Sequence, residues 1–159
     1  MHTSHCHAPV TARYFEDYVP GSVYEYGAIR LDEADIITFA KDFDPQYFHL
    51  DREAAAHSPF GGLIASGWHT TCVMMRLMVD HYLSECSCLG SPGVDELRFH
   101  LPVRPGDSLS IRVTVVQAHR SRSKPDRGVV RSRVEVLNQN REVVLTMKGT
   151  TFMRCRNTS

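Results

Sequence analysis

The segment from Trp68 to Leu83 restricts the possible folds more than any other part of the chain. Apolar residues occupy nearly every side of the helix that it would form, at Trp68, Cys72, Val73, Met74, Met75, Leu77, Met78, Val79, Tyr82 and Leu83. A helix of this kind in a water-soluble protein is buried on nearly every side. Arg76 and Asp80 interrupt the run, which a lipid-exposed span would not tolerate. We therefore expect one long, buried helix that the remaining chain covers.

The segments that can cover this helix alternate apolar and polar residues. This alternation predicts antiparallel strands near residues 97–101, 109–115, 130–136 and 143–147, with turns at Pro105-Gly106-Asp107 and at Asn138-Gln139-Asn140. A further strand is expected at residues 22–31, ahead of the helix. Antiparallel strands can cover a helix with one face and meet water or a partner with the other. The order of elements predicts an α+β fold with a curved antiparallel sheet wrapped around a long central helix.

A polar loop between short helices precedes the long helix. Asp32 is a candidate N-cap for a helix that carries Ile36, Ile37, Phe39, Ala40 and Phe43 on one side and Asp42 at its C-terminal end. Pro45 removes a backbone donor and ends regular structure there. Asp51 is a candidate cap for a second short helix, so that His49 would lie just before it. This loop brings carboxylates and an imidazole between buried elements.

Composition excludes several classes of function. Lys plus Arg and Asp plus Glu both number 18, so there is no overall positive field for nucleic acid. Five scattered cysteines and an N-terminus without a secretory pattern favour the reducing cytoplasm. We expect a single domain over residues 13–156, no membrane segment, and a flexible tail over residues 1–12. The tail residues His2, His5, Cys6 and His7 lack the fixed spacing of a metal site, and we predict no metal.

Two motifs carry a resemblance to a known family. Asp42-Phe43-Asp44-Pro45-x-x-x-His49-Leu50-Asp51 is followed by Phe60-Gly61-Gly62-Leu63-Ile64-Ala65-Ser66-Gly67, and residues 97–107 read Leu-Arg-Phe-His-Leu-Pro-Val-Arg-Pro-Gly-Asp. From Tyr14 to Met153 the chain resembles the MaoC-like acyl dehydratases, relatives of the R-specific enoyl-CoA hydratases, which have the hot-dog fold. The family motif usually reads Asp-x-Asn-Pro-x-His. This chain has Asp44 in place of the Asn and two extra residues before His49.

The resemblance implies a catalytic site at these motifs. In the resembling hydratases, the equivalents of Asp42 and His49 hold one water, and a backbone N–H equivalent to that of Gly67 polarises the thioester carbonyl. Because acyl tails need apolar walls, we also expect an acyl tunnel beside the long helix, with Tyr82 near the acyl chain and substrate-binding residues at Tyr47, Phe48, Ser66, Trp68, Cys72 and Met75. The chemistry requires no cofactor. The alternative is that Asp42 caps a turn and His49 lies on the surface, while Asp44 is expected to form an Asx-type turn.

Three functions therefore stay open from the sequence. The first is an enzyme that adds water to, or removes it from, a 2-enoyl-CoA; the others are a hot-dog acyl-CoA thioesterase and a non-catalytic acyl-thioester binder. The unpaired edge of a curved sheet predicts a homodimer, or a larger assembly of dimers. A group of cations from Arg112 to Arg133 surrounds a turn whose acid is Asp126. It either binds the phosphates of coenzyme A or forms a solvated hairpin.

Overall fold

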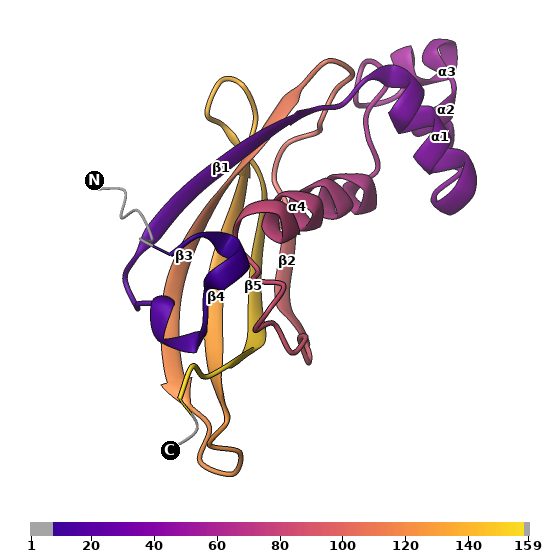
Figure 1. Ribbon diagram of the computed structural model, residues 1–159. Helices are drawn as coiled ribbons and strands as arrows, with labels where there is room; N and C mark the ends of the chain where they lie inside the picture. Colours follow the sequence, from indigo (N-terminus) through magenta and orange to yellow (C-terminus); the bar gives the residue numbers. More distant parts are fainter. Residues whose placement is uncertain (1–7, 158–159) are drawn as a thin grey trace.

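The computed structural model describes residues 8–157 and contains a five-stranded antiparallel sheet (Figure 1). The strand order is β1-β3-β4-β5-β2. The strands are β1 (Val23–Arg30), β2 (Gly93–Phe99), β3 (Ser108–Arg120), β4 (Arg127–Leu137) and β5 (Val143–Arg154). Each strand predicted from the alternation is present, and β3, β4 and β5 extend beyond their predicted ends. The β1 and β2 strands form the two edges of the sheet.

The core lies between this sheet and helix α4 (Gly67–His81), which crosses one face of the sheet (Figure 1). Along β3, Leu109, Ile111, Val113 and Val115 are fully buried and alternate with polar residues that face away from the helix. On α4, Met74 and Leu77 are buried against this layer. The predicted arrangement of one long helix against a curved antiparallel sheet is therefore confirmed.

Three short helices lie beyond the N-terminal end of α4: α1 (Glu33–Phe43), α2 (Tyr47–Leu50) and α3 (Arg52–Ala56). Asp51 caps α3 as predicted, because its Oδ1 accepts from the N–H groups of Glu53 and Ala54. Asp32 precedes α1 but makes no capping hydrogen bond; its carboxylate accepts from Arg30 instead. His49 lies inside α2, a single helical turn of four residues, and not in the predicted loop.

The expectation that the long helix is buried on nearly every side is wrong. Four exposed residues follow one another at intervals of about one helical turn along one side of α4. They form an apolar stripe of Trp68, Cys72, Met75 and Val79. The exposed fractions of Trp68, Met75 and Val79 are 60%, 43% and 54%. The sheet covers only the opposite side of the helix, because one layer of strands cannot enclose a cylinder. Arg76 lies on the exposed side as well, paired with Asp80 at 2.9 Å.

The N-terminal segment lies against the end of α4. It contains two 3-10 turns, Val10–Ala12 and Phe15–Asp17. Between them, the buried Arg13 donates from Nη1 to the carbonyl of His81 at 2.9 Å, which satisfies one C-terminal carbonyl of α4. The histidines and cysteine at positions 2–7 lie outside the described residues. None of the helices between residues 8 and 157 is long and apolar enough to cross a membrane.

An ion cluster on the outer face of the sheet predicts acid sensitivity. The Glu25 carboxylate accepts from Arg141 and Arg112, and these hydrogen bonds lower its pKa to about 2. A lowered pKa stabilises the folded state above pH 4.5 and loses this contribution as the pH falls toward 2. We expect Glu25→Gln to lower the free energy of unfolding at pH 7 by about 1–2 kcal/mol. Urea denaturation at pH 7 and pH 3 should show a smaller pH dependence for the variant than for the wild type.

Candidate active site

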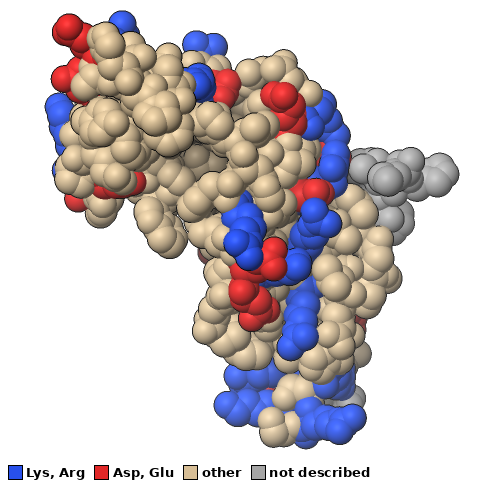
Figure 2. Space-filling view, turned by 180° about the vertical axis from the view of Figure 1, so that it is seen from behind, with Lys and Arg blue, Asp and Glu red and all other residues tan. Residues whose placement is uncertain are grey.

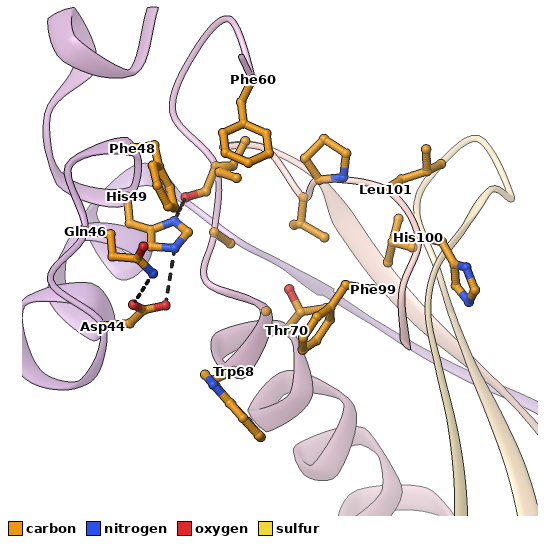
Figure 3. A pocket seen from close by; sticks show the side chains of 16 residues that line it. Asp44, Gln46, Phe48, His49, Phe60, Trp68, Thr70, Phe99, His100 and Leu101 are labelled. Carbon is orange, nitrogen blue, oxygen red and sulfur yellow. Dashed lines mark hydrogen bonds and ion pairs between the residues drawn. The ribbon is translucent and has the colours of Figure 1, made fainter. Parts of the chain in front are cut away.

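A cavity of about 360 Å³ lies where the N-terminus of α4 meets α2 and the β2–β5 side of the sheet (Figure 3). Its polar lining comes from Asp44, Gln46, His49, Thr70 and His100. Its apolar wall comes from Phe48, Phe60, Ile64, Trp68, Phe99 and Val144, among others. An apolar pocket with a few convergent polar groups is the usual form of a small-molecule site. We therefore take this cavity as the candidate active site.

His49 is fixed in one orientation by its two ring nitrogens. Its side chain is buried, and Nδ1 lies 2.7 Å from the carbonyl oxygen of Ile64. Because a carbonyl only accepts, Nδ1 must carry the hydrogen of this bond. The other nitrogen, Nε2, lies 3.3 Å from Oδ2 of Asp44 (Figure 3). The imidazole and the carboxylate therefore face each other directly across this contact.

The Asp44 carboxylate is held from several sides. The residue ends α1, where its backbone N–H donates to the carbonyl of Ala40. Its Oδ2 accepts from the Ser66 hydroxyl at 2.7 Å, and its Oδ1 accepts from Gln46 at 2.7 Å. Burial acts to raise the pKa of Asp44, but the hydrogen bonds from Ser66 and Gln46 and the nearby His49 outweigh it and leave the pKa below its ordinary value. Asp44 is therefore a positioned carboxylate that remains ionised at neutral pH.

Ser66 connects this pair to the start of α4. As the N-cap, its hydroxyl oxygen accepts from the N–H of Trp68 at 3.2 Å while the hydroxyl donates to Asp44. Gly67 follows as the first residue of the helix and lines the cavity. The N–H of such a residue has no partner within its own helix, and the helix dipole places partial positive charge there. The cavity thus combines a carboxylate–imidazole pair with a helix N-terminus.

Gly67 is required by its contact with an aromatic ring. A Cβ atom on Gly67 would lie 2.6–2.8 Å from three ring atoms of Phe99, much closer than real Cβ atoms approach carbon. The Phe99 ring also packs edge-on against Trp68, with ring centroids 6.4 Å apart. In Figure 3 these two rings lie beside the first turn of α4, opposite Asp44 and His49. Phe99 therefore forms the wall of the cavity next to the helix N-terminus.

The structure does not bring Asp42 to His49. Asp42 is exposed and lines a different hollow, with Asp35, Phe39 and His69. Helix α1 continues through Phe43, and residues two apart on a helix point about 200° away from each other. Asp42 and Asp44 therefore face opposite sides, and Asp44 occupies the place expected for Asp42. In the sequence, Asp44 stands directly before Pro45, a position that equally predicts an Asx-type turn, and so the sequence alone did not identify it as a site residue.

The other residues expected at the site separate into groups. Phe48 and Trp68 line the cavity, whereas Ser66 lies behind it and positions Asp44. Met75 lines a second, apolar cavity of about 230 Å³ further along α4. Tyr47 and Cys72 are exposed and line neither of these cavities. Sequence reasoning missed Gln46, Phe60, Thr70, Phe99 and His100, all of which line the cavity.

Comparison with known proteins agrees with this geometry. The family model described as MaoC like domain matches residues 15–139. The chain belongs to the MaoC-like domain family. A MaoC-like dehydratase from Rhodospirillum rubrum has 41% sequence identity and a TM-score of 0.86, with 92% of this chain and 99% of that chain covered. The predicted hot-dog fold and family are therefore confirmed.

Two relatives of this MaoC-like protein have names that describe an activity. An R-hydratase from Pseudomonas aeruginosa has 25% identity and a TM-score of 0.69, with 91% of this chain and 86% of that chain covered. A 3-hydroxybutyryl-CoA dehydratase from Methylorubrum extorquens is 30% identical over 109 residues, which are 65% of this chain and 64% of that protein. The first name describes the addition of water, and the second describes the removal of water from a hydroxyacyl-CoA.

Proposed function

We propose that this MaoC-like protein catalyses the reversible addition of water to a 2-enoyl thioester, with Asp44 and His49 as the acid/base pair. The observation that carries the proposal is the 3.3 Å contact between His49 Nε2 and Asp44 Oδ2, facing a cavity at the N-terminus of α4. The MaoC-like relatives named as a hydratase and a dehydratase support the same class of reaction. The earlier assignment of Asp42 to this pair is replaced by Asp44.

The proposed reaction starts with a proton on His49 Nε2 and with Asp44 ionised. Water adds through its oxygen to C3, and the Asp44 carboxylate accepts the proton that this water loses. The proton on His49 Nε2 is delivered to C2, where the enolate carries its negative charge. Transfer of the proton from Asp44 back to His49 across their contact restores the starting state, so no net proton is consumed. Dehydration follows the same steps in reverse.

The helix N-terminus can stabilise the enolate. During addition of water at C3, negative charge moves to the thioester oxygen. An N–H donor fixed in advance near that oxygen stabilises the charge without reorganisation. Gly67 N–H is the group in the cavity that meets this requirement, since it lies at the positive end of α4. Phe99 and Trp68 restrict the access of water from that side.

The second cavity is suited to the end of an acyl chain. It lies on the same β2–β5 side of α4 and is lined by Met75, Met78, Leu83, Val94 and Met147, among others. Methionine side chains adapt to apolar ligands of different shape. Tyr82, also expected near the acyl chain, is buried behind this cavity and shares a hydrogen bond with Ser132. The acyl chain would therefore extend from the first cavity along α4.

Activity with crotonyl-CoA and longer 2-enoyl-CoAs tests the proposal. Hydration removes the absorbance of the conjugated double bond and releases no thiol, whereas a thioesterase releases free thiol. We expect loss of the double bond at a rate that depends on enzyme concentration, with no release of thiol. Release of thiol without hydration would favour the thioesterase, and binding without either reaction would favour the acyl-thioester binder.

We also propose that two copies pair through their β2 edges. The apolar stripe of α4 lies near exposed Val94 and Phe99 of β2, so apolar surface and unpaired strand groups occur on the same side of the molecule. Antiparallel pairing of β2 with its copy would satisfy the edge and cover these side chains. We expect light scattering at micromolar concentration to give at least a dimer, and Val94→Glu with Met75→Glu to give a monomer. A monomeric wild type would contradict this proposal.

A further inference from the structure

The hairpin between β3 and β4 carries a concentration of positive charge in a chain with no net charge. We call residues 120–127 the basic hairpin; its cations are Arg120, Arg122, Lys124 and Arg127, and its acid is Asp126. Figure 2 shows Lys and Arg side chains gathered at this end of the molecule, away from α1–α3. Exposed Arg154 lies beside Arg127 on the neighbouring strand.

Two of these cations are free to bind an anion. Arg120 is paired with Glu16, and Arg127 is paired with Asp126 through two hydrogen bonds. Arg122 and Lys124 are exposed, and the residues from 8 to 157 include no acid paired with either. Positive side chains that lie close together without acidic partners repel one another, and this repulsion slightly destabilises the folded state. The arrangement suits a ligand with several negative charges, such as a phosphorylated nucleotide.

The basic hairpin is far from the candidate active site of its own subunit. The middle of β2, Glu96, lies beside Lys148, and Lys148 lies beside Arg133. Phe99, in the wall of the cavity, lies three residues beyond Glu96 toward one end of the sheet. Arg127, at the start of β4, lies six residues from Arg133 toward the other end. At about 3.3 Å per residue and about 4.8 Å between strands, the hairpin tip and the cavity are roughly 35 Å apart.

The proposed dimer changes this distance. Antiparallel pairing of the two β2 strands reverses the direction of the partner's sheet, so the partner's basic hairpin lies at the same end as the cavity. The cavity of one subunit and the basic hairpin of its partner are then separated by about 10–15 Å along the strands and about 14 Å across them. The total distance is roughly 20 Å. A pantetheine arm of about 13 bonds spans roughly 16 Å from sulfur to phosphate. Long Arg and Lys side chains cover the remaining distance.

We propose that the basic hairpin of each subunit binds the phosphates of a coenzyme A thioester whose acyl group occupies the partner's cavity. This inference rests on the proposed hydration of enoyl thioesters and on the β2-edge dimer. Arg122 and Lys124 act on the nucleotide and not on the reacting atoms. Their contribution is therefore to the binding of the substrate and not to the chemical step.

A comparison of two thioesters tests this role. Crotonyl-CoA carries the phosphates, whereas crotonyl-N-acetylcysteamine has the same reacting group and no phosphate. We expect Arg122→Gln with Lys124→Gln to raise the KM for crotonyl-CoA about tenfold or more, because charge-assisted contacts are lost, and to leave kcat unchanged. The KM for crotonyl-N-acetylcysteamine should not change. A matched control, Lys41→Gln with Arg131→Gln, removes the same charge from two exposed cations outside the hairpin that, like Arg122 and Lys124, have no ion pair among the described residues.

Mixed dimers show which subunit's basic hairpin binds the substrate of a given cavity. One subunit carries His49→Ala with an intact hairpin, the other keeps His49 and carries Arg122→Gln with Lys124→Gln, and two affinity tags isolate the mixed species. The working cavity then faces an intact hairpin of the partner, and we expect the wild-type KM for crotonyl-CoA. In a second mixed dimer, one subunit carries His49→Ala, Arg122→Gln and Lys124→Gln, and its partner is wild type. The working cavity of the wild-type subunit then faces the altered hairpin, and we expect the raised KM.

Each failure has a separate signature. If the wild type hydrates neither thioester, the proposed function fails and this inference fails with it. If the wild type hydrates both but the hairpin variant keeps the wild-type KM for crotonyl-CoA, only the inference fails. A raised KM in the first mixed dimer and a normal KM in the second would show that the hairpin acts within its own subunit, against the proposed geometry.

Discussion

Asp44→Asn and His49→Ala are each expected to lower kcat for hydration of crotonyl-CoA by about 10²–10⁴-fold. Each change removes one member of the pair whose Nε2–Oδ2 distance is 3.3 Å, so the remaining member can no longer exchange a proton with it. The double variant should be little slower than either single variant, since residues that act as a unit are not additive. Stopped-time assays over a wide range of enzyme concentration measure these rates.

Asp42→Asn provides the matched control, because it makes the same chemical change two residues away on the exposed side of α1. We expect near wild-type kcat for this variant. Asp44→Asn also restores the Asp-x-Asn-Pro pattern usual in the resembling family, yet we expect it to be inactive because Asp42 points into another hollow. An active Asp44→Asn variant, together with an inactive Asp42→Asn variant, would return the catalytic role to Asp42.

Gly67→Ala is expected to lower kcat by about a hundredfold, although the backbone N–H is retained. The new methyl group would lie 2.6–2.8 Å from ring atoms of Phe99, so the ring must move and the wall of the cavity moves with it. Displacements of about 1 Å in an active site can cost about 10²-fold in rate. Alanine is a better helix former than glycine, so loss of helix propensity would not explain the effect.

A second substitution tests whether crowding against Phe99 explains the loss of rate in Gly67→Ala. Phe99→Ala removes the ring that the new methyl group would meet, so we expect Gly67→Ala to cost little further kcat when it is added to the Phe99→Ala variant. Thermal unfolding of all the variants checks that they are folded. If Gly67→Ala lowers kcat about a hundredfold in the Phe99→Ala variant as well, the contact with Phe99 is not the reason that position 67 is glycine.

The local pattern of the chain was enough to predict the five strands and the helices α1, α3 and α4, but not α2. The alternation in Leu109, Ile111, Val113 and Val115 has the two-residue period of a half-buried strand, and the tertiary structure buries those four side chains. Asp51 was recognised as a cap because its hydrogen bonds reach only two and three residues along the chain. Features that depend on neighbours in sequence could be predicted from sequence.

The exposure of α4 required the tertiary structure. Hydrophobic residues on every side predicted burial on every side, but the sheet of one subunit covers only part of the helix. Trp68 and Val79 remain more than half exposed. The sequence shows that these side chains are apolar. It does not show whether another part of the same chain covers them.

By itself, the sequence determined the family, the order of helices and strands, and the importance of His49 and Gly67 as candidates, through motifs whose residues are close together along the chain. Only the tertiary structure decided which carboxylate faces the imidazole. Asp42 and Asp44 are two residues apart, and the choice depends on where α1 ends and on the Ser66 hydroxyl, which comes from 22 residues further along the chain. The direction of a side chain at the end of a helix is fixed by such distant contacts, because local preferences there differ by too little free energy to select one direction.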